Sequence, residues 1–381
     1  MVDKTISMFN PTRNFFEKRE NYEKKITKVL EHGSFINGPE IKELEDKLKE
    51  YVNVKHAIGV SSGTDALLVA LMAIGVNPDD EVVTIPFTWI STVEVVKILG
   101  ATPKFCDISA DTFNMDPKSL EKVITEKTKV IIPVSMFGHI YDVENVLNVV
   151  RIAEKRYGNK IYIVEDAAQS FGSLDNYDRK SCSVSDIGCT SFFPSKPLGC
   201  FGDGGMCFTN DDELSLKMRM IKNHGCIERY DYKCIGINGR LDTLQASILL
   251  AKYSDFDISL SKRIANAKAY NEAFLNLPFK TPQKHGCNKH VYAQYTVIFQ
   301  DEKTCNDMLL YLKEHKIGCG KFYPVCLHLV DAITTNYEKG SFPVSEDVSK
   351  KVLSLPVYSE LLKEERDYII SVIKKYFCKK L

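Results

Sequence analysis

Residues 190–209, TSFFPSKPLGCFGDGGMCFT, place Lys196 in a turn between two apolar segments. Two phenylalanines precede the lysine, and the run Gly202-Asp203-Gly204-Gly205 follows it, where a backbone without side chains can approach a neighbour closely. Burial lowers the pKa of a lysine, and a neutral amine can form a Schiff base with a carbonyl group. A solvated lysine in a surface loop is the commoner alternative. The interpretation of this turn therefore depends on the strands around it.

Short apolar segments alternate with helical patterns through the first half of the chain. The expected strands are His56–Ser62, Glu81–Ile85, Thr102–Cys106, Val130–Val134, Lys160–Val164, Cys189–Phe193 and Gly205–Thr209. Strands that alternate with helices are typical of a mostly parallel sheet covered by helices on both faces. The pattern predicts an α/β fold in which the lysine turn joins the last two of these strands.

The second half of the chain has a different pattern. A long helix is expected from Ala246 to about Phe274, and further elements are expected as a strand at His290–Phe299 and helices at Thr304–His315 and Lys363–Phe377. Helical spacing is also found near the N-terminus, over 15–31 and 39–52. We predict three parts: an N-terminal segment over 1–30 that packs with the small domain, a large domain over 31–250, and a small C-terminal α/β domain over 251–381.

The composition argues against several classes of protein. Lys plus Arg equals Asp plus Glu, 50 against 50, without the basic excess typical of nucleic-acid-binding proteins. No window approaches the roughly 20 apolar residues of a membrane span, and the N-terminus has no apolar stretch of signal-peptide length. The 12 cysteines include no C-x-x-C pair, so no metal site is expected. We predict a cytoplasmic protein without nucleic-acid or membrane partners.

Two polar segments that follow expected strands could bind a ligand. Ser61-Ser62-Gly63-Thr64-Asp65 precedes a buried apolar helix, and free N–H groups at a helix N-terminus bind anions. A plain N-cap explains the same residues. Asp166, in Val164-Glu165-Asp166-Ala167-Ala168-Gln169, follows another strand at the sheet edge where α/β folds bind ligands. Its carboxylate could pair with a protonated ring nitrogen, and a helix cap or a structural hydrogen bond is an equal alternative.

Trp89, in Pro86-Phe87-Thr88-Trp89, is the only tryptophan of the chain. Its ring could stack on a planar cofactor, but a place in the core is the better interpretation from the residue alone. His224, His290 and His328 are interpreted as structural histidines, because they lack the i,i+4 pairing of a metal site.

In order along nearly the whole chain, these segments resemble the DegT/DnrJ/EryC1/StrS sugar aminotransferases. The resemblance rests on SSGTDAL (61–67), PFTW (86–89), EDAAQSFG (165–172), TSFFPSKPLGCFGDGGMCFTND (190–211), GINGRLDTLQA (236–246), HVYAQYTV (290–297) and FPVSEDVSKKVLSLPVY (342–358). Each piece is weak alone, but the ordered set is specific. The resemblance implies the type I fold of pyridoxal-phosphate enzymes, with a mostly parallel seven-stranded sheet between helices in the large domain and a smaller C-terminal α/β domain.

The resemblance also implies roles for individual residues. Lys196 matches the lysine that holds pyridoxal 5'-phosphate as a Schiff base and then moves a proton, and Asp166 matches the partner of the pyridine nitrogen. Trp89 matches the aromatic residue that stacks on the ring, and Gln169 matches the residue near the ring hydroxyl. The implied phosphate contacts are Gly63, Thr64, Asp65, Ser191 and, across a dimer interface, Asn238. At least a homodimer with shared active sites is therefore implied.

The likeness is greatest to the branch that acts on 3-keto nucleotide sugars, with L-glutamate as the amine donor. The implied substrate contacts are Arg240, Phe322 and Tyr323. Relatives usually have His-Tyr-Pro where this chain has Phe322-Tyr323-Pro324, which leaves a uronate and a 6-deoxy sugar both open. Arg240 could bind a carboxylate or phosphate as a bidentate donor, or form an interface salt bridge. We predict an aminotransferase that converts a UDP- or dTDP-linked keto-hexose to the amino sugar, with a 4-keto-sugar aminotransferase or a pyridoxal-phosphate-dependent sugar dehydratase as alternatives.

Overall fold

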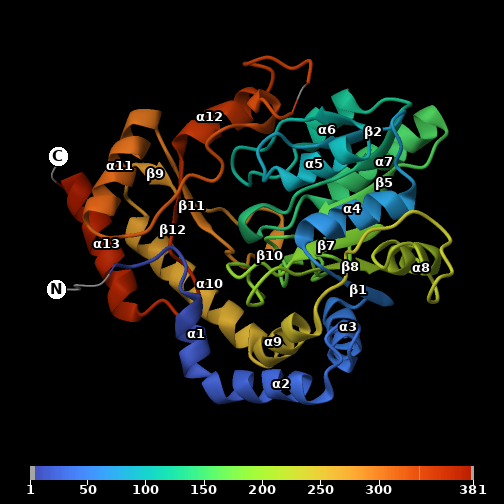
Figure 1. Ribbon diagram of the computed structural model, residues 1–381. Helices are drawn as coiled ribbons and strands as arrows, with labels where there is room; N and C mark the ends of the chain where they lie inside the picture. The colour runs from blue at the N-terminus through green and yellow to red at the C-terminus, as the bar shows by residue number, and fades with distance from the viewer. Residues whose placement is uncertain (1–4, 334, 379–381) are drawn as a thin grey trace.

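The computed structural model describes residues 5–333 and 335–378 (Figure 1). Its centre is a seven-stranded sheet with the order β1-β8-β7-β5-β4-β2-β3. The strands are β1 (His56–Val60), β2 (Glu81–Thr84), β3 (Thr102–Phe105), β4 (Thr128–Ile131), β5 (Tyr162–Asp166), β7 (Ile187–Ser191) and β8 (Gly205–Thr209). Within this sheet β8 runs antiparallel to both of its neighbours and the other pairs are parallel. The prediction of a mostly parallel seven-stranded sheet is confirmed.

Helices cover both faces of this sheet, because successive residues of a strand point to opposite sides. Val130 and Val164 pack against one layer of helices, whereas Ile131 and Ile163 pack against the other. The first layer contains α4 (Gly63–Ile74), α5 (Ser91–Ile98) and α8 (Asp212–Ile221), and the second contains α6 (Pro117–Val123) and α7 (Val143–Tyr157). Beside β1 and β8, the second face is covered by α3 (Pro39–Val52) and α9 (Thr243–Tyr253). Burial on both faces explains the continuous apolar runs of the strands.

The chain after α9 forms a smaller unit around an antiparallel sheet of order β12-β11-β9. Its elements are α10 (Phe256–Phe274), β9 (Phe279–Lys280), β11 (Tyr295–Phe299), α11 (Glu302–Glu314), α12 (Pro343–Lys351), β12 (Val352–Leu355) and α13 (Lys363–Cys378). An apolar cluster of its own joins α10, α11 and α13 to this sheet. The remaining short elements are β6 (Leu174–Asp175), which pairs with β10 (Cys287–Lys289), and the 3-10 turns η1 (Met136–Gly138) and η2 (Leu327–Leu329).

The N-terminal segment contacts both parts of the chain. It contains α1 (Pro11–Glu17) and α2 (Arg19–His32), and α2 runs below α9 in Figure 1. Ile6 is buried in the apolar cluster of the smaller unit, and Arg13 pairs with Glu365 of α13 at 2.8 Å. Tyr22, by contrast, is buried with residues of α3 and α9. The segment therefore lies across the junction between the two units.

Two elements differ from those predicted. The prediction of a single helix from Ala246 to about Phe274 is wrong, because Ser254 and Asp255 separate α9 from α10. The Ser254 hydroxyl bonds the Ala251 carbonyl, and Asp255 leaves the helical region at φ −122° and pairs with Lys18. Short polar side chains compete in this way with helical backbone bonds. The strand expected from residue 290 begins only at residue 295, because Tyr292 has a φ of 48°.

The helices have the lengths of an ordinary globular protein. The longest, α10, has 19 residues and carries charged side chains such as Lys262 and Lys268 on its exposed side. In the part of the chain that the structure describes, no helix is both long and apolar enough to cross a bilayer.

Candidate active site

A cavity of about 430 Å³ lies at one edge of the large sheet. β5 ends at Asp166 and β7 ends at Ser191, and because these strands are parallel, both residues reach the same edge. β1 runs in the same direction, so the turn from β1 into α4 lies there too. The sequence-predicted residues that line the cavity are Gly63, Thr64, Trp89, Asp166, Gln169, Ser191, Lys196, Phe322 and Tyr323. The structure therefore brings together residues that are up to 260 positions apart in the sequence, from Gly63 to Tyr323.

Lys196 enters this cavity from a tight turn after β7. Its N–H donates to the Phe193 carbonyl at 2.9 Å, and Gly199 allows the turn to close, since a Cβ there would lie 2.7 Å from the Phe193 and Pro194 carbonyl oxygens. Burial lowers the pKa of the Lys196 amine, and the negative charge of Asp166 opposes that shift. A lysine held in this way can act as a neutral nucleophile and base.

Asp166 is a buried carboxylate with neutral hydrogen-bond donors. The side chain is 6% exposed, and it accepts hydrogen bonds from the Thr92 hydroxyl at 2.8 Å and from the Ala168 N–H at 3.2 Å. Burial raises the pKa of Asp166, while these two bonds and the charge of Lys196 lower it. A cationic ring nitrogen beside this carboxylate would compensate the cost of burying its charge.

The turn from β1 into α4 forms a cradle for an anion. Ser62 caps α4 by accepting a hydrogen bond from the Asp65 N–H at 3.0 Å, and the Thr64 hydroxyl lies 2.7 Å from that of Ser91. Gly63 lies against Ser191, because a Cβ on the glycine would come 2.6 Å from the Ser191 Cβ. Free N–H groups and hydroxyls at a helix N-terminus are suited to a phosphate. The Asp65 carboxylate itself is bonded to the Ser61 hydroxyl and does not line the cavity.

Aromatic and amide side chains close the cavity on the side of the smaller unit. Gln169 donates to the Tyr323 hydroxyl at 3.1 Å and accepts from the Phe137 N–H at 2.8 Å, which fixes the orientation of its amide. Trp89 lies 6.2 Å from Tyr323, measured between ring centroids, and is 60% exposed. The interpretation of Trp89 as a core residue is therefore wrong: its ring forms a wall of the cavity.

Asn238 and Arg240 lie away from this cavity in the described chain. Asn238 is exposed and pairs through its backbone with Asn223. Arg240 donates to the Asn223 side chain at 3.0 Å, and its Nε has no hydrogen-bond partner. Exposed apolar side chains precede them, with Tyr232 at 61% and Ile235 at 85% exposure. Neither residue can serve the cavity of its own chain in this arrangement.

Several residues of the cavity were missed from the sequence. Ser91 lines the cavity at the start of α5, and the buried Thr92 beside it reaches the cavity only through its bond to Asp166. Gln294 lies in the loop before β11 with a buried Oε1 that has no hydrogen-bond partner. Other lining residues that were not predicted are Ser62, Leu67, Thr88, Val134, Ala168, Phe193, Ser195 and Asp203. For Gln294 a signal existed, because the amide interrupts the apolar segment HVYAQYTV. For Ser91 and Thr92, no local sequence pattern indicates that they lie at the cavity or beside Asp166.

Proteins of known structure share this architecture. DesV from S. venezuelae, solved in complex with a ketimine intermediate, aligns with a TM-score of 0.91 and 31% identity over 98% of each chain. A sugar aminotransferase from Streptococcus pneumoniae, solved in its PLP form, aligns with a TM-score of 0.88 and 26% identity over 95% of this chain and 97% of that chain. The UDP-2-acetamido-2-deoxy-3-oxo-D-glucuronate aminotransferase of Pseudomonas aeruginosa is 43% identical over 88% of this chain and 90% of its own length.

Fold and cavity together define the class: this is a pyridoxal-phosphate-dependent aminotransferase with the type I fold. The sequence model of one family matches residues 17–374, and the chain belongs to the DegT/DnrJ/EryC1/StrS aminotransferase family. The cavity fits the cofactor, since it offers a helix N-terminus for a phosphate, a buried carboxylate for a ring nitrogen and a lysine for an aldehyde. Lys196, Asp166 and the α4 cradle are the groups that would hold it.

Proposed function

We propose that this protein transfers an amino group from L-glutamate to the 3-keto group of a UDP-linked hexose. The observation that carries the proposal is the meeting of Lys196 and Asp166 in one cavity with the α4 cradle. The name of the Pseudomonas aeruginosa relative specifies a UDP-linked 3-oxo sugar as the acceptor, which supports the choice of nucleotide and ring position. A 4-keto acceptor and a dehydratase reaction are the alternatives that product analysis must separate from it.

Each residue of the cavity has a distinct part in the proposal. Pyridoxal phosphate, when bound, supplies an electron-poor ring that stabilises negative charge at the carbon losing a proton. Lys196, as a neutral amine, would take that proton and return it to the carbon on the other side of the transferred nitrogen. Asp166 would keep the ring nitrogen protonated, and Thr92 orients the carboxylate through its 2.8 Å hydrogen bond. Trp89 would cover the ring, and Gln169 would lie near the ring hydroxyl.

The phosphate of the cofactor is assigned to the turn before α4. The backbone N–H groups of Gly63, Thr64 and Asp65 begin this helix, and the Thr64 and Ser191 hydroxyls lie beside them. We assign the sugar to the side of Phe322 and Tyr323, which line the cavity from the smaller unit. Phe322 cannot donate a hydrogen bond, so a uronate carboxylate would have to be bound by another group, for which Arg240 of a second subunit is suited.

A homodimer with shared active sites is part of the proposal. Asn238 and Arg240 lie outside the cavity of their own chain, next to exposed apolar side chains that a partner subunit would cover. In the dimer, Asn238 would reach the cofactor phosphate of the second subunit. The division into a large domain over 31–250 and a small domain over 251–381 is proposed as well and is supported by the separate apolar cluster of α10, α11 and α13. Packing of residues 1–30 with the small domain is supported by Ile6 and Arg13, whereas Tyr22 packs against the large domain.

The proposal is tested by following both half-reactions. Glutamate added to the purified holoenzyme should change the absorbance of the cofactor and release 2-oxoglutarate. A UDP-linked 3-oxo-hexose added next should restore the first spectrum and be converted to the 3-amino sugar. Matched UDP- and dTDP-linked 4-oxo sugars, and neutral and uronate forms of the 3-oxo sugar, serve as alternative acceptors. A preference for a 4-oxo acceptor, or a deoxy product without an amine, would overturn the assignment.

A further inference from the structure

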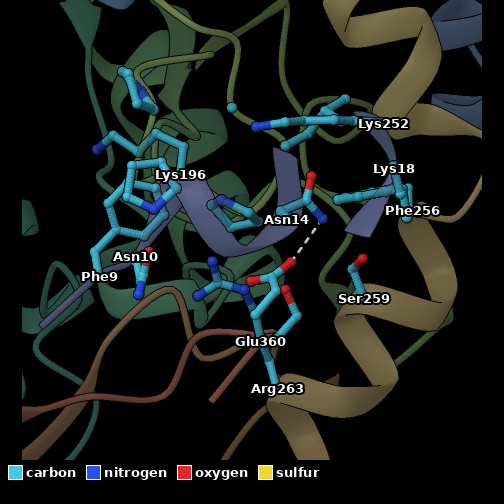
Figure 2. A pocket seen from close by; sticks show the side chains of 16 residues that line it. Phe9, Asn10, Asn14, Lys18, Lys196, Lys252, Phe256, Ser259, Arg263 and Glu360 are labelled. Carbon is cyan, nitrogen blue, oxygen red and sulfur yellow. Dashed lines mark hydrogen bonds between the residues drawn. The ribbon is translucent and has the colours of Figure 1, made fainter. Parts of the chain in front are cut away.

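A second cavity lies behind the turn that carries Lys196. The N-terminal segment, α10 and the loop after β12 enclose it (Figure 2). Pro194, Lys196, Pro197 and Gly199 form its wall on the side of the turn, and Lys196 also lines the first cavity, so the two cavities meet at this short segment of chain. Its volume of about 40 Å³ has room for a small ion and excludes a nucleotide sugar.

Basic side chains dominate the lining of this cavity. Lys18, Lys252 and Arg263 line it together with Lys196 of the turn and one acidic residue, Glu360. The Lys18 ammonium is paired with Asp255. Lys252 and Arg263, in contrast, form no ion pair with a carboxylate of residues 5–333 and 335–378. Two cations inside the protein therefore lack a counter-ion.

Arg263 is the more deeply buried of these two cations. The residue is 4% exposed, and its Nε has no hydrogen-bond partner. Figure 2 shows its side chain leaving α10 beside Glu360 and extending toward the cavity. Burial lowers the pKa of the guanidinium to about 10, and the charge of Glu360 only partly opposes this. A guanidinium is kept inside a protein at a large cost unless an anion or acceptors surround it.

Lys252 approaches the same cavity from the end of α9. Its ammonium lies 4.7 Å from the centre of the Phe201 ring, which is a weak substitute for a carboxylate. Burial lowers the pKa of Lys252 to about 8, with Arg263 and Lys18 lowering it further and Glu360 and Cys200 opposing. The ammonium would regain its ordinary pKa only if an anion came near it.

Glu360 does not neutralise these cations by direct contact. Its Oε1 accepts a hydrogen bond from the Asn14 amide at 2.8 Å, drawn as a dashed line in Figure 2. The Asn14 oxygen accepts in turn from the Tyr22 hydroxyl. The carboxylate is therefore held by the N-terminal segment, and the Ser259 hydroxyl on the α10 wall remains as a donor toward the cavity.

We propose that this cavity binds a small oxyanion of the size of inorganic phosphate. Arg263 would bind two of its oxygens, Lys252 a third, and the Ser259 hydroxyl would complete the set. This site lies on the opposite side of the Lys196 turn from the α4 cradle, so it is separate from the place assigned to the cofactor phosphate. A bound anion would stabilise the conformation of the Lys196 turn. The free energy of unfolding of the holoenzyme would then depend on the concentration of free phosphate.

The test is thermal unfolding of the cofactor-saturated enzyme with phosphate titrated against KCl at constant ionic strength. Saturating phosphate should raise the Tm by about 3–6 °C at pH 7. Arg263→Gln and Lys252→Met should each abolish the rise, whereas Lys262→Gln, an exposed change on α10, should keep it. Arg263→Lys should retain part of it, because it retains the charge. The rise should shrink as the pH passes above about 8, where unliganded Lys252 loses its proton.

Several results would overturn the proposal. An equal rise in wild type and in Lys252→Met places the phosphate elsewhere, even if Arg263→Gln fails to fold. Loss of the effect when excess pyridoxal phosphate is added assigns the phosphate to the cofactor cradle. Phosphate could also leave the Tm unchanged while the Lys252→Met or Arg263→Lys protein elutes from gel filtration as a smaller species than the wild type. That combination would show that a group of a second subunit neutralises these cations. Chloride acting as well as phosphate would mean a general salt effect.

Discussion

The two halves of the candidate active site are built from different kinds of structure. On the cofactor side, Asp166 and Ser191 end parallel strands of a buried sheet, and Gly63 begins the helix that follows a third strand. On the sugar side, Phe322 and Tyr323 come from a loop of the smaller unit. Backbone bonds of the sheet hold the first group, whereas packing between the two units of the chain holds the second. The residues assigned to the chemistry are therefore placed by one sheet, while those assigned to the sugar depend on how the two units pack.

The largest effect is expected from Lys196→Ala on the cofactor side. Lys196→Ala removes the amine that we assign to the proton transfer, so transamination should fall by about 10³-fold or more, within the range of general acid–base catalysis. Release of 2-oxoglutarate from glutamate measures it, and Lys262→Ala serves as the matched control because Lys262 is exposed on α10. Retained transamination by Lys196→Ala would contradict the assignment of Lys196 to the proton transfer on the cofactor side.

A smaller loss is expected from Asp166→Asn. The amide cannot hold a proton on the ring nitrogen, and loss of one partner of a buried ion pair costs about 3–5 kcal/mol, which corresponds to roughly 10²–10⁴-fold in rate. The same change should lower the pKa of Lys196 further, because the charge of Asp166 raises it. The pH dependence of cofactor capture by the apoprotein reports that pKa: its midpoint should move to lower pH. A midpoint that moves upward would contradict the assigned electrostatics.

Completion of each cofactor site by a second subunit is tested by mixing two defective proteins. Asn238→Ala should lower activity by about tenfold, the effect of one lost hydrogen bond to a charged group. When Lys196→Ala and Asn238→Ala subunits are mixed and allowed to exchange, each hybrid dimer should regain one intact site. Activity above that of the two separate proteins is the expected result. A mixture whose activity equals the sum of the activities of the two separate variants would contradict shared active sites.

The smallest effect is expected from Thr92→Val, which removes the hydroxyl bonded to Asp166 at 2.8 Å. The loss should be about tenfold or less in kcat, with the KM for glutamate nearly unchanged, because Thr92 acts through Asp166. Thr92→Ser should restore most of it. Thr102→Val, an exposed change on β3, is the control. An increase in KM alone would mean that Thr92 contacts the substrate instead of positioning Asp166.

The sequence predicted the cofactor side well because its residues follow strands. Asp166 and Lys196 each lie at the end of an apolar strand segment, and parallel strands deliver their ends to one edge. Thr92 could not be predicted, since its contact with Asp166 spans 74 positions and no local pattern marks it. The core interpretation of Trp89 failed for a related reason: composition favours burial of a large ring, but only packing decides whether a cavity lies beside it.

Neighbouring residues alone predict the order of strands and helices, the turn around Lys196 and the helix start at Gly63, because local geometry and alternating burial depend on short stretches of chain. Long-range packing, in contrast, separates α9 from α10, joins Gln169 to Tyr323 and brings Arg263 and Lys252 to one cavity beside the lysine turn. These contacts join distant segments, and their free energy depends on burial and charge that no short stretch of sequence contains.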